Sequence, residues 1–181
     1  MKSKIFIGVL TLLLLSSCQI SHQISYLAAN GAEQVRLFFQ RISVEEVITD
    51  PKTPPHVRSR LILSQNVLEF ARSIGLTTKS QYTKYVQLDR DYLTYVVSAA
   101  PKWEMMSYKW DYPFIGEMPY RGFYDFKNAE SEEIELQKQG LDTYLRGVSA
   151  FSMLGWISDP VYSSMLRSTE EDFVNTILHE L

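Results

Sequence analysis

The chain has 181 residues, of which 45% are hydrophobic and 22% are charged, a composition that suits a folded domain with its own core. Its 18 basic and 21 acidic residues give a net charge of −3, and no basic patch stands out. This balance excludes an obvious nucleic-acid-binding role, and we expect small or peptidic partners. The single cysteine excludes an internal disulfide.

The N-terminus has the pattern of a secretory signal. Two lysines, Lys2 and Lys4, precede an apolar run over residues 5–15, which is too short to span about 30 Å of hydrocarbon as a helix. The following Leu-Ser-Ser-Cys18 resembles the bacterial lipobox, whose cysteine is acylated and becomes the first mature residue. We therefore expect residues 1–17 to be a signal peptide and lipid on Cys18 to tether residues 18–181 to a membrane. Gln19, and not aspartate, follows the cysteine, and this resembles lipoproteins that are sorted to the outer membrane of two-membrane bacteria.

The first half of the mature chain is predicted to be helical. Apolar spacing favours a helix over residues 26–48, with a break or kink at Asn30-Gly31. The proline-rich residues 50–55 form a stiff connector, and a second helix is expected from Val57 to Gly75.

Strand signals begin at residue 82. Residues 85–88 and 92–97 are rich in tyrosine and β-branched side chains and predict strands about a short turn at residues 89–90. Residues 103–126 favour irregular strands and loops, residues 128–140 a helix, and residues 142–152 a returning strand. We interpret four carboxylates of that helix as a solvated face: Glu130, Glu132, Glu133 and Glu135. Helices flanking a tyrosine-rich mixed or antiparallel sheet make the predicted fold class α+β.

The last predicted helix carries the most informative residues. Ser168 as N-cap and Glu171 three residues later fit a capping box, so the helix should begin near Thr169. At about 100° per residue its apolar positions form one arc: Phe173, Val174, Ile177, Leu178 and Leu181. On the opposite side, His179 falls near Asp172, Asn175 and Thr176.

The pair His179-Glu180 has two interpretations that periodicity does not separate. It can be part of the solvated face of a surface helix. It can also be the start of an H-E-x-x-H motif, in which two histidines hold zinc and the glutamate is the general base.

Several segments together carry a resemblance. Residues 114–125 (FIGEMPYRGFYD), residues 144–156 (YLRGVSAFSMLGW) and the Asp159-Pro160 pair resemble the bacterial family of predicted aminopeptidase lipoproteins. The ending ILHEL, residues 177–181, falls where that family enters its H-E-x-x-H helix. The resemblance covers nearly the whole chain, from the lipobox onward.

The resemblance implies a zincin-like metallopeptidase in which His179 is a zinc ligand and Glu180 the general base. The sequence ends before a second histidine, so it corresponds to the N-terminal part of such a domain, truncated within the zinc motif. Because a catalytic zinc needs three protein ligands, we expect the 181-residue chain to bind zinc poorly and to be inactive by itself. We also expect the apolar arc of a helix ending at Leu181 to lack partners and to make the chain unstable.

Two alternatives stay open at this point. Arg121 and Arg146 can each contact a substrate carboxylate or form an ion pair that organises a loop, the second being the commoner role. Tyr120, Tyr124 and Trp110 can line a peptide groove or fill a core. For the whole protein, the candidate functions are a membrane-tethered zinc aminopeptidase acting on peptides and a noncatalytic envelope lipoprotein that binds a partner.

Overall fold

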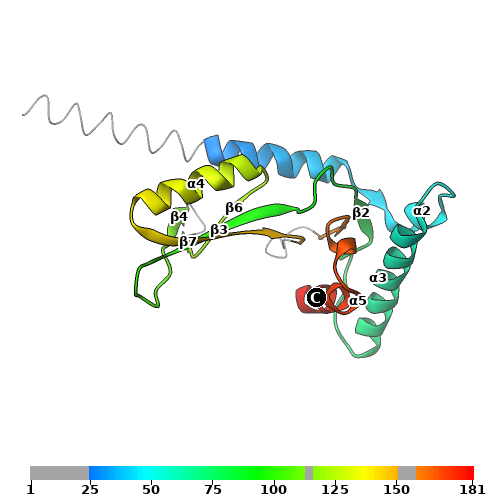
Figure 1. Cartoon of the computed structure of the whole chain (residues 1–181). Coiled ribbons are helices and arrows are strands. Elements are labelled where there is room, and N and C mark those ends of the chain that lie inside the picture. The colour runs from blue at the N-terminus through cyan, green and yellow to red at the C-terminus, as the bar shows by residue number, and fades with distance from the viewer. Residues whose placement is uncertain (1–24, 113–115, 151–157) are drawn as a thin grey trace, which may run out of the picture. The chain divides into compact units, whose positions relative to one another are not determined.

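A computed structural model describes residues 25–112, 116–150 and 158–181 (Figure 1). The chain divides into two compact units, residues 1–39 and residues 40–181. The predicted signal peptide and Cys18 lie outside the described residues. Across the described ranges, no helix combines the length and the apolar character needed to cross a membrane.

The described part of the first unit is helical from residue 25 to residue 39. The predicted break at Asn30-Gly31 is wrong, because the helix continues through both residues. The Asn30 side-chain amide donates to the carbonyl of Tyr26, 2.9 Å away, and a single glycine costs a helix only about 1 kcal/mol. The predicted helix over residues 26–48 is instead two helices, since strand β1 (Ile42–Ser43) precedes helix α2 (Val44–Thr49).

Helix α3 (Pro55–Ser73) confirms the second predicted helix. Pro55 occupies its first turn, where the missing N–H costs nothing. At the other end Gly75 adopts φ +89°, and the amide of Leu76 donates to the carbonyl of Ala71. The face of α3 that enters the core consists of Leu61, Ser64, Val67, Leu68 and Ala71.

A small mixed sheet stands beside α3. Strand β2 (Lys84–Val86) pairs antiparallel with β1 and parallel with β8 (Val161–Tyr162). Helix α5 (Glu170–Glu180) follows the short 3₁₀ helix η1 (Met165–Arg167) and packs against α3. Elements that are far apart in the sequence therefore pack together in this part of the fold.

The second sheet is antiparallel and has the order β6-β3-β7. Strand β3 (Thr94–Pro101) pairs with β6 (Arg121–Phe123) and, over eight residue pairs, with β7 (Leu141–Val148). Helix α4 (Phe126–Lys138) packs on one face of this sheet, and strands β4 (Trp110–Tyr112) and β5 (Gly116–Met118) form a separate pair.

The fold class α+β is confirmed, with small sheets in place of one continuous sheet. The two strands predicted from residues 85–88 and 92–97 exist as β2 and β3, but they lie in different sheets. The return strand predicted over residues 142–152 is β7, which ends at Val148, and residues 151–152 lie outside the described residues.

The carboxylates of α4 are not all solvated, contrary to the prediction. Glu132 is largely buried, at 12% side-chain exposure, and its Oε1 accepts from Arg121 Nη1 at 3.2 Å and from the Trp110 indole at 2.8 Å. Glu133 accepts from the Thr143 hydroxyl at 3.1 Å. Two of the four predicted surface acids therefore fix α4 to the neighbouring strands.

Helix α5 is capped one residue later than predicted. Thr169, not Ser168, is the N-cap, and its hydroxyl oxygen accepts from the amide of Asp172 at 3.1 Å. The expectation that the apolar arc lacks partners is wrong for Phe173 and Ile177, which are fully buried. Both lie in the helix that packs on α3, and the Arg60 guanidinium lies 5.9 Å from the Phe173 ring centre.

Candidate functional site

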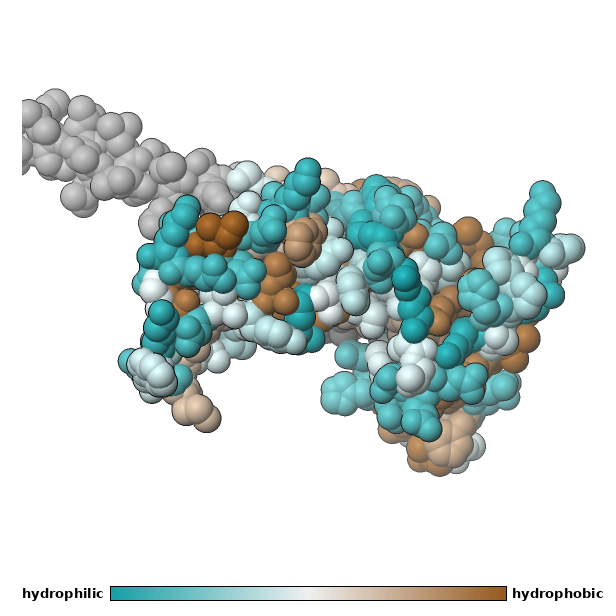
Figure 2. All heavy atoms as spheres, viewed as in Figure 1, coloured by the Kyte–Doolittle hydropathy of each residue, from teal (hydrophilic) through white to brown (hydrophobic). Residues whose placement is uncertain are grey.

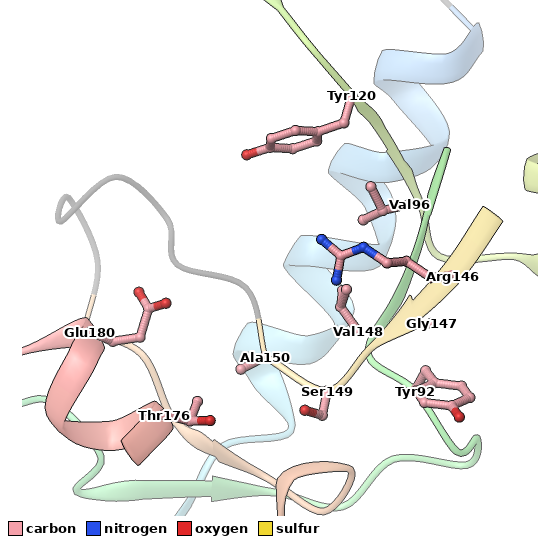
Figure 3. A pocket seen from close by; sticks show the side chains of 10 residues that line it. All are labelled: Tyr92, Val96, Tyr120, Arg146, Gly147, Val148, Ser149, Ala150, Thr176 and Glu180. Atoms are coloured by element: carbon pink, nitrogen blue, oxygen red, sulfur yellow. The ribbon is translucent and has the colours of Figure 1, made fainter. Parts of the chain in front are cut away.

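A cavity of about 640 Å³ lies within residues 40–181, between the β3–β7 strands and the C-terminal end of α5 (Figure 3). Its lining comes from distant parts of the sequence: Tyr92, Val96, Tyr120, Arg146, Gly147, Val148, Ser149, Ala150, Thr176 and Glu180. The volume falls within the range of about 300–1,000 Å³ that is typical of small-ligand sites.

The end of α5 brings the predicted catalytic glutamate to this cavity. The Thr169 cap sets the start of the helix, and burial of Phe173 and Ile177 fixes its rotation. Glu180 follows Phe173 by about two turns and lies on nearly the same face, but it stands in the last turn, where it is exposed and lines the cavity with its carboxylate projecting inward (Figure 3). His179 is also exposed, as predicted for the polar face, but it is not among the residues lining the cavity.

Arg146 faces Glu180 from the sheet side of the cavity (Figure 3). It lies on β7 directly opposite Val96 of β3, and its side chain is exposed because alternate residues of β7 point away from the face that α4 covers. Within the described part of the chain, its guanidinium makes no hydrogen bond or ion pair. The two arginines considered from the sequence therefore differ, because Arg121 forms the structural ion pair with Glu132.

Tyrosines frame the sheet side of the cavity. The Tyr120 hydroxyl points into the open space from the residue just before β6 (Figure 3). Tyr92 packs edge-on against Tyr95 and lies directly over Gly147, where a Cβ atom would overlap its ring. Trp110, by contrast, is buried and bonded to Glu132, and Tyr124 lies 5.4 Å below the Arg90 guanidinium.

A buried polar cluster lies under Glu180, around a small cavity of about 10 Å³. Tyr82, Asp159 and Tyr162 line it together with Glu180. Burial, followed by the negative charges of Asp159 and Glu180, raises the pKa of Tyr82 well above its ordinary range. Tyr82 also adopts φ +57°, a conformation that is uncommon for a bulky residue.

Arg41 provides positive charge for the same cluster. One of its nitrogens donates to the carbonyl of Ser158 at 2.9 Å, and its side chain hydrogen-bonds Tyr162. Burial raises the pKa of Tyr162, and Arg41 opposes this shift. From the sequence, Asp159 is only part of the family resemblance, and Tyr82 marks the start of the strand signals. No local pattern links positions so far apart, so the cluster could not be found before the fold was known.

The predicted zinc site is incomplete among the described residues. A catalytic zinc takes three protein ligands and keeps one open position. Among residues 25–112, 116–150 and 158–181, no group of three or more His, Cys, Asp or Glu side chains could hold a metal ion. His179 and Glu180 alone do not satisfy that requirement, so no catalytic step through zinc follows from this geometry.

Comparison with known proteins identifies the family. The family model described as "Putative aminopeptidase" matches residues 25–181. The chain belongs to this family. No curated protein and no solved structure gives a significant match.

The family match covers every element described above, from the N-terminal helix to the end of α5. It agrees with the aminopeptidase part of the resemblance seen in the sequence. The zincin-like motif and the lipid anchor stay predictions.

Proposed function

We propose that the protein is a membrane-tethered, zinc-dependent aminopeptidase of the bacterial cell envelope, with Glu180 as its general base. The observation that carries the proposal is the placement of Glu180. Its carboxylate projects into a cavity of ligand size and, within the described residues, forms no hydrogen bond or ion pair. Membership of the aminopeptidase family supplies the reaction class.

In this proposal Glu180 takes the proton from the water that attacks the peptide carbonyl. A carboxylate can do this only if it is ionised and within hydrogen-bond reach of the proton that it takes. The exposure of Glu180 at the cavity wall supports this role, whereas Glu132 is held in a buried ion pair. His179, which follows Thr176 on the polar side of α5 and does not itself line the cavity, would supply one zinc ligand, and the remaining ligands would have to come from residues outside those described. Bound zinc would polarise the scissile carbonyl.

The direct test uses the protein produced from its own gene, including any coding sequence beyond codon 181. Glu180→Gln keeps the size of the side chain but removes the base, so we expect hydrolysis of short peptides in the presence of zinc to fall by about 10²-fold or more. Glu171→Gln, an exposed acid in the first turn of the same helix, is the matched control and should keep full activity. Equal activity of wild type and Glu180→Gln would refute the assignment.

The zinc part has its own test in the DNA. Reading the gene past codon 181 should show a histidine two residues after Leu181, with an acidic ligand further on. A stop codon with no such coding sequence in any frame would remove the zinc part of the proposal.

The membrane tether depends on Cys18. Mass spectrometry of the mature N-terminal peptide should find lipid on Cys18, and Cys18→Ser should lose both the lipid and detergent-phase partitioning. Ser21→Ala, just beyond the lipobox, is the control and should change neither. An unmodified N-terminal peptide from the wild type would overturn this part.

A noncatalytic, partner-binding lipoprotein is the second candidate, and the loop between β3 and β4 favours it. Trp103 and Met105 are fully exposed there, and Met106 is 64% exposed. The projecting end of this loop carries hydrophobic atoms at the lower left of Figure 2. Exposed apolar clusters commonly mark interaction surfaces. If the complete gene product with zinc hydrolyses no peptide while Trp103→Ala abolishes its cellular role, this candidate replaces the first.

A further inference from the structure

The cavity presents opposite charges on two walls. Among its described lining residues, Glu180 is the one with an acidic side chain and Arg146 the one with a basic side chain. Glu180 projects from α5 and Arg146 from β7 (Figure 3). Arg146 is exposed and has no partner among the described residues, whereas the buried Arg121 is paired with Glu132. Arg146 is thus a cation held at a ligand-sized cavity without a partner among the described residues.

We propose that Arg146, assisted by the Tyr120 hydroxyl, binds the C-terminal carboxylate of short peptide substrates. This inference rests on the proposed peptidase function and adds the substrate class. The enzyme would favour peptides short enough for the free carboxylate to lie at Arg146 while the scissile bond lies at Glu180.

The strand register makes Arg146 a well-positioned binding group. Eight residue pairs hold β7 against β3, with Val96 opposite Arg146, so the backbone that carries the arginine is fixed. Val96 and Val148 line the cavity beside the arginine and offer apolar contact for its methylene stem. The head group is left to face the open space, and little conformational freedom of the strand is lost on binding.

The donors match a carboxylate. A guanidinium presents two parallel N–H groups that fit both oxygens of a carboxylate, and such charge-assisted bonds are about twice as strong as neutral ones. The Tyr120 hydroxyl, which also faces the cavity, is a third donor. Neither residue offers a comparable site for an ammonium group, so the peptide is oriented with its carboxyl end at β7.

The proposed carboxylate contact, and not the volume of this open cavity, sets the preferred substrate length. About 640 Å³ accommodates a short peptide, and in the proposed orientation a longer polypeptide would continue past Arg146. A chain that continues has no carboxylate at that point and leaves the arginine unpaired. The inferred preference is therefore for peptides of a few residues over long polypeptides.

A carboxylate can also come from an acidic side chain, and three tripeptide ligands separate the two sources. Isothermal titration of the complete protein, with zinc removed by a chelator so that the peptides are not hydrolysed, would use Ala-Ala-Ala, its C-terminal amide, and Ala-Glu-Ala amide. We expect Ala-Ala-Ala to bind at least about 10-fold more tightly than its C-terminal amide, which is the difference expected from one charge-assisted hydrogen-bonding contact. If Ala-Glu-Ala amide binds as tightly as the free acid, Arg146 does not select the C-terminal carboxylate and the site binds acidic side chains.

Arg146→Gln should remove the preference for the free acid. Arg146→Lys should keep part of the preference, because lysine has the positive charge but lacks the planar guanidinium that binds both carboxylate oxygens. Tyr120→Phe should weaken binding of the free acid by a few-fold. The control is Arg167→Gln, an exposed arginine that does not line this cavity. Equal affinity for acid and amide in the wild type, an unchanged preference in Arg146→Gln, or no binding of any peptide would overturn the proposal.

The same titration on Glu180→Gln keeps the two proposals apart. Binding with the carboxylate preference should persist in that variant while hydrolysis is lost. Persistent binding with unchanged hydrolysis would refute the base assignment and leave the carboxylate site standing. Hydrolysis that depends on Glu180, without any preference for free acids, would support the base assignment and refute the carboxylate site.

Discussion

Arg121 and Glu132 form an ion pair between strand β6 and helix α4, with Nη1 and Oε1 3.2 Å apart. Their side chains are 8% and 12% exposed, so neither charge is well hydrated. The Trp110 indole donates to the same carboxylate oxygen at 2.8 Å and joins β4 to this arrangement. Glu132 therefore connects α4, β6 and β4, and its loss should destabilise the packing of these three elements.

Glu132→Gln should destabilise the protein by about 3 kcal/mol, because it leaves the Arg121 charge buried without its counter-charge. Urea unfolding followed by circular dichroism measures this loss. Glu130→Gln, an exposed position of the same helix, is the control and should change stability by less than about 0.5 kcal/mol. If both variants unfold at the same urea concentration as the wild type, the ion pair does not stabilise the fold.

Gly147→Ala should also destabilise, by about 1–3 kcal/mol, since the new methyl group would overlap the Tyr92 ring. Gly122→Ala on β6 is a matched control, because a Cβ there would meet nothing within 4 Å. In a Tyr92→Ala background, Gly147→Ala should cost much less, which a double-mutant cycle of unfolding free energies would show. A cost that stays the same in that background would assign the effect to the strand backbone.

Stability should fall at alkaline pH through the buried tyrosines. Tyr82 has a folded-state pKa above its ordinary value of 10.0, so the folded protein keeps a proton that the unfolded chain loses. The stabilisation is complete below about pH 10 and is lost as pH rises toward the folded-state pKa, at up to about 1.4 kcal/mol per pH unit for each such group. Tyr162 and Tyr85 act in the same direction, because burial raises the pKa of each.

Tyr82→Phe isolates this contribution. Urea midpoints between about pH 9 and pH 11 should decline less steeply in this variant than in the wild type. Tyr144→Phe, at a position that is 63% exposed, should keep the wild-type slope. Identical slopes for all three proteins would show that Tyr82 does not ionise on unfolding in this range.

Helix α5 offers a direct comparison of two neighbouring residues. Thr169→Ala should cost about 1 kcal/mol, because its hydroxyl oxygen caps the amide of Asp172. Ser168→Ala should cost less, since its hydroxyl donates to the Met165 carbonyl of the preceding turn and does not cap α5. Thermal unfolding of the two variants measures both. A larger loss for Ser168→Ala would place the cap where the sequence alone predicted it.

Elements with local signals were predicted well from the sequence. Helix α3 follows from proline at its start and Gly75 at its end, and α4 from the run that ends at Gly140. The rotation of α5 follows from the spacing of Phe173 and Ile177, which correctly placed His179 on the exposed side. The exposure of Glu180 was not predicted, because seven residues after Phe173 it returns to nearly the same face of the helix. In each case the deciding interactions lie within a few residues.

Features that depend on distant pairing were not predicted. Strand pattern alone could not show that β2 joins β8 and not β3, because pairing is decided by packing of the whole layer. Glu132 carries the same helical signal as its exposed neighbours, and its burial depends on Arg121 and Trp110 from other strands. The facing of Glu180 and Arg146 likewise needs β7 and α5 to be in place together.

The parallel pairing of Tyr85 with Val161 joins positions that lie far apart in the sequence, so we expect it to form late in folding. The β6-β3-β7 sheet and α4 are contributed by residues between these two positions, and contacts of shorter range can assemble them early. The sheet that contains β1 and β2 can be completed only after β8 has been synthesised, and this pairing closes a long loop. On the ribosome, the wall that carries Arg146 would thus be completed before the wall that carries Glu180. Pulse-labelled hydrogen exchange should show protection of β3 and β7 before that of β2.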